Sequence, residues 1–247
     1  MSALVYGGRS PIALEICRQL AGAGHEVHLV TRVRDEAIVA LAKENGCSEV
    51  HECNLEDSTK SIELALKIDS QVGGLDAVAF AHRYRSGISA PLKQYSVEVY
   101  TPYEILEALA RQNRAEECAV VLLTSPAAHS VVGDQDFQYH ASKAALSQLV
   151  RFGSVRLVSQ NLRINGLSPG SFIFKQRAAD FYTKNPQIVD RAEKLIPLSR
   201  MGTVEEIASV ALFLLSEQSN YMNGQILEVD GGLSNIDLAS LSKKFKP

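Results

Sequence analysis

Tyr139 and Lys143 lie four residues apart in the segment DFQYHASKAALSQLV, whose apolar spacing is helical. On an α-helix, residues i and i+4 share one face. A lysine ammonium beside a phenol favours the phenolate, because two unit charges at about 4 Å attract by about 4 kcal/mol at an effective dielectric of about 20. Such a pair can act as an acid or a base. The alternative is a surface helix that carries both residues by coincidence, so the surrounding sequence has to decide.

Strand and helix patterns alternate along the chain. Apolar runs predict strands at 3–6, 26–31, 75–81, 118–125, 163–168 and 225–230, and the helical patterns cover 11–22, 35–45, 58–70, 94–113, 137–160 and 203–215. This alternation predicts an α/β fold, with a doubly wound parallel sheet that has helices on both faces. Ligands of such sheets bind outside the carboxyl ends of the strands. No linker divides the 247 residues, so we expect a single domain, 1–247.

The composition is that of an ordinary globular protein, with 46% hydrophobic and 21% charged residues and a net charge of -3. This balance gives no support to binding of nucleic acid or a membrane surface. The cysteines at 17, 47, 53 and 118 show neither a CxxC pair nor a metal-ligand spacing, so we expect reduced thiols and no metal. The amino-terminal sequence MSALVYGG lacks a basic segment followed by a long apolar run, which favours a cytoplasmic protein.

The turn after the first predicted strand reads YGGRSPIALEICRQL. Gly7 and Gly8 allow a tight turn, Ser10 suits the N-cap, and Pro11 suits the first helical position. The amino terminus of that helix would then face a pyrophosphate. A purely structural turn before a helix is the alternative, because Gly-Gly turns are common.

The second half of the chain carries a group of motifs that resembles the short-chain dehydrogenase/reductase family. They are YHASKAAL, RINGLSPG and PLSRMGTVEEIASVALFLLSEQSNYMNGQILEVDGG, within 118–233. The chain is most similar to 3-oxoacyl-carrier-protein reductase-like members. The resemblance implies a Rossmann-type fold and an NAD(P)-dependent oxidoreductase that moves hydride between nicotinamide and a ketone or secondary alcohol. Enoyl reductases of the same superfamily fit less well, since they usually separate Tyr and Lys by six residues rather than three.

The resemblance also implies the roles of the catalytic residues. Tyr139 would donate and accept the proton at the substrate oxygen, Lys143 would promote this and hold the nicotinamide ribose, and Ser125 would hydrogen-bond the same oxygen. Ser125 precedes Tyr139 by fourteen residues, where the family commonly has thirteen. Thr124 is the fallback, and Ser125 could instead satisfy only local backbone.

The cofactor contacts follow from the same resemblance. NAD-specific members carry an Asp at the end of the second strand, whereas here the run is Thr31, Arg32, Val33, Arg34. Arginines would bind the extra phosphate, so NADP (NADPH) is favoured over NAD, although these residues could be solvated loop charges. The implied cofactor-binding residues are Gly7, Arg9, Ser10, Ile12, Arg32, Asn54, Leu55, Ala81, Tyr139, Lys143, Pro169, Gly170 and Phe172.

Several positions depart from the family pattern. The glycine turn has Tyr6 for Thr, Pro11 for the second Gly and Ala13 for the third. The NNAG segment has become Phe80, Ala81, His82 and Arg83, a relay Asn would fall near Tyr100, and Phe174 replaces a Thr. His82 is either a polar wall of the active site or an ordinary strand-end histidine. These departures motivate an alternative function, a catalytically weak dinucleotide-binding sensor or scaffold.

The segment 171–197 corresponds to the substrate lid of the family and mixes aromatic residues with Lys175, Arg177 and Lys184. With Arg83 and Arg85 on the opposite wall, these cations would suit a small-molecule substrate with an apolar part and an anionic part, though a solvated face explains them equally well. The resemblance further implies a homotetramer or homodimer built partly from helices 94–113 and 137–160.

Overall fold

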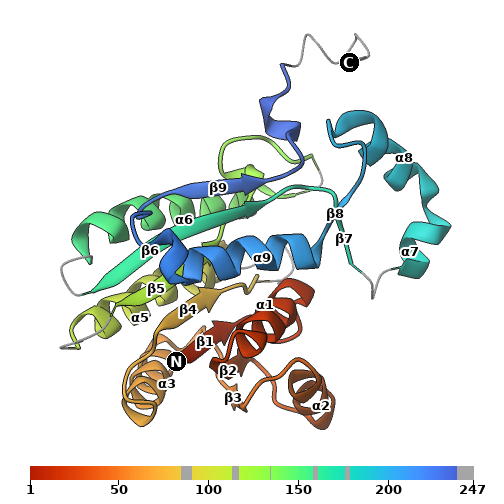
Figure 1. Ribbon diagram of the computed structural model, residues 1–247. Helices are drawn as coiled ribbons and strands as arrows, with labels where there is room; N and C mark the ends of the chain where they lie inside the picture. Colours follow the sequence, from red (N-terminus) through yellow and green to blue (C-terminus); the bar gives the residue numbers. More distant parts are fainter. Residues whose placement is uncertain (85–90, 113–116, 134, 158–160, 176–178, 238–247) are drawn as a thin grey trace.

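Seven parallel strands form one sheet in the computed structural model, which describes residues 1–84, 91–112, 117–133, 135–157, 161–175 and 179–237 (Figure 1). The strand order is β3-β2-β1-β4-β5-β6-β9. The strands are β1 Ser2–Tyr6, β2 Glu26–Thr31, β3 Glu49–Glu52, β4 Ala77–Phe80, β5 Cys118–Leu123, β6 Leu162–Pro169 and β9 Ile226–Val229. The order reverses between β1 and β4, and this switch point is where doubly wound sheets bind dinucleotides.

Helices cover both faces of the sheet, and each face has its own apolar core (Figure 1). One face packs against α1 Pro11–Gly22, α2 Glu36–Glu44 and α9 Val204–Leu215. The other packs against α3 Ser58–Gln71, α5 Thr101–Ala110 and α6 Phe137–Arg156. Because both faces are buried, the central strands read as continuous apolar runs rather than as alternating ones. Strand β5, for example, is buried along its whole length.

The predicted single-domain, doubly wound α/β architecture is confirmed, and two local predictions were incomplete. Strand β3 was missed, because its sequence EVHE is short and polar and lies at the sheet edge. The helix predicted at 94–113 is divided into α4 Pro91–Tyr95, a π-helical turn η1 Ser96–Tyr100, and α5. Residue 113 of that range and residues 158–160 of the predicted helix 137–160 lie outside the described residues.

The segment 171–197 folds beside the main sheet and contains β7 Ile173–Phe174, α7 Ala179–Lys184 and α8 Pro186–Leu195 (Figure 1). Strand β7 pairs with β8 Gly202–Thr203 in a separate two-stranded sheet. This pairing connects the segment to the start of α9. The sequence predicted no helices in this segment, and its role as a substrate lid stays a prediction.

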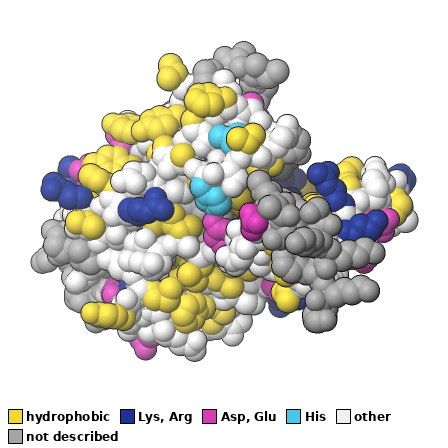
Figure 2. All heavy atoms as spheres, turned by 90° about the horizontal axis from the view of Figure 1, so that it is seen from above, with side chains coloured by type: hydrophobic (Ala, Val, Ile, Leu, Met, Phe, Trp, Pro, Cys, Tyr) yellow, Lys and Arg dark blue, Asp and Glu magenta, His cyan; other side chains and the backbone are white. Residues whose placement is uncertain are grey.

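Seen from above, the surface carries hydrophobic side chains in several patches, with Lys and Arg side chains at separate places and histidine side chains near the middle of the view (Figure 2). This mixture agrees with the small net charge of -3. Within the described ranges, no helix has both the length and the apolar character needed to cross a membrane.

Candidate active site

The site residues predicted from the sequence follow the carboxyl ends of five strands. Gly7 comes directly after β1, Arg32 after β2, Ala81 after β4 and Gly170 after β6, while Ser125 lies two residues beyond β5. Because the strands are parallel, these positions share one edge of the sheet. The fold therefore brings together residues that lie far apart in the sequence.

Tyr139 lies in the first turn of α6. Asp136 is the N-cap of this helix, and its Oδ1 accepts a hydrogen bond of 2.8 Å from the backbone N–H of Tyr139. The amino terminus of a long helix carries partial positive charge, which favours a nearby anion. Tyr139 is therefore fixed at the amino-terminal end of α6 by the cap of the helix.

Lys143 lies one turn further along α6, and its side chain is 4% exposed. Its Nζ lies 3.0 Å from Oε2 of Glu98 and donates a hydrogen bond of 3.2 Å to the carbonyl oxygen of Leu123. The same Nζ is 5.6 Å from the centroid of the Tyr139 ring. A buried ammonium is thus held between the end of β5 and the face of α6 that carries Tyr139.

Glu98 is the partner of Lys143 that the sequence analysis missed. It lies in η1 with a side chain that is only 1% exposed. Its Oε1 accepts hydrogen bonds from the backbone N–H of Tyr84 at 2.9 Å and from Nε2 of Gln94 at 3.4 Å. Tyr100, near which the relay Asn was expected, is instead 46% exposed. In the sequence, Glu98 stands between Val97 and Val99, and both valines are buried in the structure. A glutamate between two apolar residues is the signal that could have indicated a buried carboxylate here.

Ser125 is better placed than Thr124 to contact a substrate oxygen. The hydroxyl of Thr124 is buried and donates to the carbonyl oxygen of Leu167 at 3.2 Å. Ser125 is half-buried, and its Oγ accepts a hydrogen bond of 3.2 Å from the N–H of Ala127. That bond uses an acceptor lone pair and leaves the O–H donor for another partner. The 3₁₀ turn that Ser125 begins packs against α6, the helix of Tyr139 and Lys143.

Arg83 covers one face of the Tyr139 ring. Its Cζ lies 4.2 Å from the ring centroid, and its Nη2 donates to Oε1 of Gln135. A guanidinium in this position makes a cation–π contact. Arg83 stands where the family has the last Gly of its NNAG segment, and it faces Tyr139, the candidate catalytic residue.

Tyr6 and Phe80 are two departures from the family pattern that pair with each other. They are register partners on β1 and β4, and their rings stack with centroids 4.7 Å apart. Burial raises the pKa of the Tyr6 phenol well above its ordinary value, so the group stays neutral. The backbone N–H of Ala81 still donates to the carbonyl oxygen of Tyr6 at 2.8 Å. The backbone pairing at the ends of β1 and β4 is therefore kept although these two side chains depart from the family pattern.

His82 supports the adjacent π-helical turn. Its Nε2 lies 2.8 Å from the carbonyl oxygen of Val97, which requires the proton on Nε2. Nδ1 is enclosed and has no hydrogen-bond partner among the residues that the structure describes. Burial lowers the pKa of His82. The histidine is thus a neutral group whose bond to Val97 helps to hold η1 in place.

We expect His82→Gln to weaken the dependence of stability on pH. Because the pKa of His82 is lowered in the folded state, the unfolded state takes up its proton first as the pH falls below about 6.5. The wild-type protein should then lose up to about 1.4 kcal/mol per pH unit from this group. Urea unfolding at pH 7, 6 and 5 measures the effect. His25 and His51 also have lowered pKa values but remain in both proteins, so parallel curves would refute the assignment.

The glycine turn packs so closely against its neighbours that neither Gly7 nor Gly8 has room for a side chain. A Cβ on Gly7 would lie 2.5 Å from Cβ of Ala13, so these residues give the close packing of strand and helix. Gly8 has a φ of +45°, and a Cβ there would lie 2.7 Å from Oγ1 of Thr31. Ser10 occupies the N-cap position as expected, but its side chain makes no capping hydrogen bond. Its hydroxyl is therefore not used by the helix.

The three arginines near this turn differ in what they contact. Arg9 pairs with Asp35, the N-cap of α2. Arg34 donates from Nε to the carbonyl oxygen of Val50 at 3.1 Å, so it is partly used by the sheet edge. Arg32 is exposed and makes no hydrogen bond or ion pair with the part of the chain that the structure describes. Of the three, Arg32 is the most available for a phosphate.

The remaining predicted cofactor residues lie near the same edge. Asn54 is exposed and its Oδ1 accepts a hydrogen bond from the N–H of Glu56, while Leu55 is buried. The carbonyl oxygen of Leu55 accepts a hydrogen bond of 2.9 Å from Oγ1 of Thr101. Ile12 is partly buried in the first turn of α1.

Gly170 and Phe172 line a cavity of about 310 Å³ that lies between the segment 171–197, α9 and the end of β9. Pro169 ends β6 directly before them. A Cβ on Gly170 would lie 2.8 Å from Cα of Asp230, so glycine is required there by close backbone approach. Phe174 packs on Tyr182 with ring centroids 5.0 Å apart. Arg85 and Arg177, two of the predicted substrate-facing cations, lie outside the described residues.

Comparison with known proteins agrees with this geometry. The family model described as enoyl-(acyl carrier protein) reductase matches residues 7–234. The chain belongs to the short-chain dehydrogenase/reductase family. It is 28% identical over 244 residues to the rhamnolipids biosynthesis 3-oxoacyl-[acyl-carrier-protein] reductase of Pseudomonas aeruginosa, covering 93% of this chain and 94% of that one. It is 30% identical over 247 residues to L-xylulose reductase of Caenorhabditis elegans, with coverage of 94% and 95%.

A solved structure extends the likeness to three dimensions. The Pseudomonas aeruginosa RhlG/NADP active-site complex matches with a TM-score of 0.80 and 27% identity, and covers 94% of this chain and 95% of that chain. As a short-chain dehydrogenase/reductase, the protein is an oxidoreductase that acts on a CH–OH or C=O group with a nicotinamide dinucleotide. The glycine turn before α1 and the unused Ser10 hydroxyl fit the pyrophosphate of such a cofactor.

Proposed function

We propose that this short-chain dehydrogenase/reductase is an NADPH-dependent reductase of ketones, in which Ser125, Tyr139 and Lys143 are the catalytic residues. The observation that carries the proposal is the buried Lys143 ammonium, held on the face of α6 that presents Tyr139. A lysine whose only role was to be solvated at the surface would not be held by a buried glutamate and a strand-end carbonyl oxygen. The similarity to a 3-oxoacyl reductase and a sugar reductase supports the reaction class.

When bound, a nicotinamide dinucleotide supplies the hydride for reduction or accepts it for oxidation. In reduction, Tyr139 gives its phenolic proton to the carbonyl oxygen and is left as the phenolate. Lys143 and the amino terminus of α6 stabilise that negative charge. Ser125 donates a hydrogen bond to the same oxygen, whose charge grows as the carbon is reduced. The reverse sequence oxidises an alcohol.

We assign Glu98 a positioning role in this site. It contacts Lys143 through Oε2 and is itself fixed by Tyr84 and Gln94 through Oε1. A buried ion pair of this kind defines the place of the ammonium, because each charge is costly without the other. Glu98 thereby takes the place of the relay Asn that many family members carry near this position, at Tyr100 in η1.

Arg83 favours substrates that carry an anionic group near the reacting carbonyl. Its guanidinium lies over the Tyr139 ring and is exposed on its other side. An anion on the substrate would form a charge-assisted hydrogen bond with it. A panel of matched ketones with and without a carboxylate would show a lower KM for the charged member, and equal KM values would argue against this preference.

The choice of NADPH over NADH is tested with Arg32→Ala. If Arg32 binds the 2′-phosphate, the variant should bind NADPH about tenfold to about 100-fold more weakly and NADH within a factor of about two of wild type. Titration of nicotinamide fluorescence gives both dissociation constants. Arg18→Ala is the matched control, because Arg18 is an exposed arginine on α1 that pairs with Glu15. Equal loss of affinity for both dinucleotides would contradict the assignment.

We also propose that the protein forms a homotetramer or homodimer through α5 and α6. The rings of Tyr100, Tyr103 and Phe152 follow one another at centroid distances of 6.2 Å, and Val155 beside them is 72% exposed. An aromatic surface of this kind is typical of subunit contacts. Val155→Asp should lower the mass measured by light scattering, whereas Val131→Asp, at another exposed valine, should not.

A further inference from the structure

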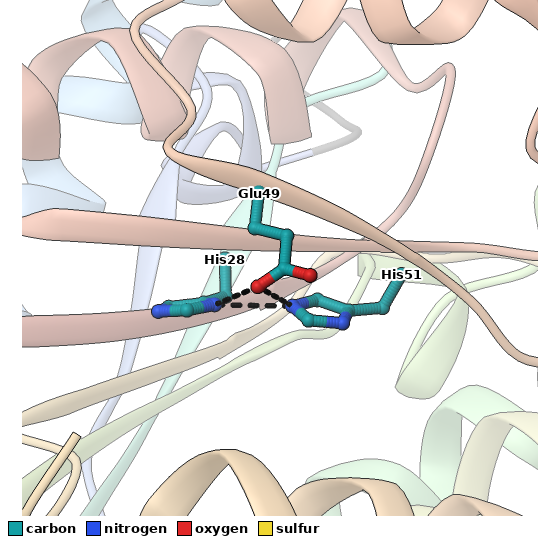
Figure 3. Close-up of side chains that lie close together, drawn as sticks. All are labelled: His28, Glu49 and His51. Atoms are coloured by element: carbon teal, nitrogen blue, oxygen red, sulfur yellow. Dashed lines mark hydrogen bonds and ion pairs between the residues drawn. The ribbon is translucent and has the colours of Figure 1, made fainter. Parts of the chain in front are cut away.

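Two histidines and a glutamate converge at the outer edge of the sheet, away from the carboxyl ends that carry the active site (Figure 3). His28 lies in the middle of β2, and Glu49 and His51 lie on the edge strand β3. The strand register pairs His28 with Glu49 and Val30 with His51. All three side chains therefore project from the same face of the sheet. Neither the reaction nor the cofactor uses this cluster.

The three donor atoms surround a common point. Nδ1 of His28 lies 3.0 Å from Nε2 of His51, and Oε2 of Glu49 lies 3.9 Å and 3.7 Å from these two nitrogens (Figure 3). In a tetrahedral zinc site with bonds of 2.0–2.1 Å, neighbouring donor atoms are about 3.3 Å apart. The observed separations lie on both sides of this value, so side-chain shifts of a few tenths of an ångström would bring all three into coordination distance.

A second carboxylate completes the arrangement. Oε1 of Glu26 lies 3.5 Å from Nε2 of His28, the nitrogen that faces away from His51. A proton on Nε2 is favoured there, and it leaves the Nδ1 lone pair directed at the cluster. Metal-bound histidines commonly donate their other N–H to a carboxylate in this way. Lys67 and Arg34 also act on His51 electrostatically, so two carboxylates and two cations surround the imidazoles.

We propose that His28, His51 and Glu49 bind a divalent transition-metal cation, with zinc as the best match to two imidazoles and one carboxylate. Water would occupy the fourth position, because the side chain of Glu49 is 61% exposed whereas that of His28 is 6% exposed. The metal would join the edge strand β3 to β2. It would thus support the loops that follow both strands, which carry Arg32 and Asn54.

Zinc itself is the probe for the test. The protein is freed of metal by dialysis against a chelator and titrated with zinc in competition with a chromophoric chelator. We expect one zinc per chain, with affinity at least about tenfold lower in His51→Asn. His129→Asn is the control, because it removes an exposed histidine elsewhere and should bind like wild type. Equal affinities of wild type and His51→Asn would overturn the proposal.

A second variant and a spectroscopic measurement protect the test against a folding defect. Glu49→Gln changes only an exposed carboxylate and should weaken zinc binding while the protein stays folded, as judged by circular dichroism. X-ray absorption at the zinc edge of the wild-type complex should show two imidazole ligands at about 2.0–2.1 Å. A spectrum with no imidazole ligand, or unchanged binding by Glu49→Gln and His51→Asn together, would reject the site.

Discussion

Tyr139→Phe is expected to lower kcat/KM for ketone reduction by about 10²- to about 10⁴-fold, the usual range for loss of a general acid. Only the phenolic oxygen is removed, so the contacts of the ring with Arg83 and Lys143 remain. Affinity for NADPH should stay within a factor of about two, and thermal stability should not change. Steady-state kinetics combined with a cofactor titration separates these effects.

Tyr221→Phe is the matched control, because Tyr221 is fully exposed and lies outside the candidate site. Normal turnover by Tyr139→Phe would remove the catalytic assignment. A wild-type protein that binds NADPH but turns over no ketone, with the same behaviour in Tyr139→Phe, would instead favour the sensor or scaffold alternative.

The second large effect concerns the buried pair of Lys143 and Glu98. Lys143→Met leaves the Glu98 carboxylate buried without its counter-ion, and Glu98→Leu does the same to the ammonium. Each single variant should lose about 3–5 kcal/mol of unfolding free energy, because a buried charge without a partner is strongly destabilising. Both should also lose activity, since the ammonium is either absent or displaced from its place beside Tyr139.

The double variant Lys143→Met/Glu98→Leu distinguishes this coupling from general damage to the core. It should be more stable than either single variant, because both charges are gone, while its activity stays lost. Denaturant unfolding of the four proteins gives the interaction free energy. Additive losses of stability would show that the two side chains are not coupled. Recovery of activity in the double variant would show that the ammonium is not needed.

The interior of the fold could be predicted from sequence, and its edges could not. The strands β4 and β5 are continuous apolar runs, and α1 begins at Pro11 as its turn chemistry indicates. Strand β3 is short and polar because it lies at the sheet edge, where its pairing with β2 rather than its composition makes it a strand. The π-helical turn η1 has no comparable local signal. Its geometry depends on tertiary contacts such as the bond between His82 and Val97.

The sequence by itself indicated the reaction class, because the motifs that resemble the family, with Tyr139 and Lys143 on one helix among them, are local properties of the chain. Only the tertiary structure decided which groups surround this pair. Glu98 reaches Lys143, and Arg83 covers Tyr139, across turns that no local pattern specifies. The same holds for His28 and His51, which are brought together by the register of two parallel strands. Residue types and spacing carry local chemistry, whereas charge partners between distant segments arise only when the sheet and helices pack.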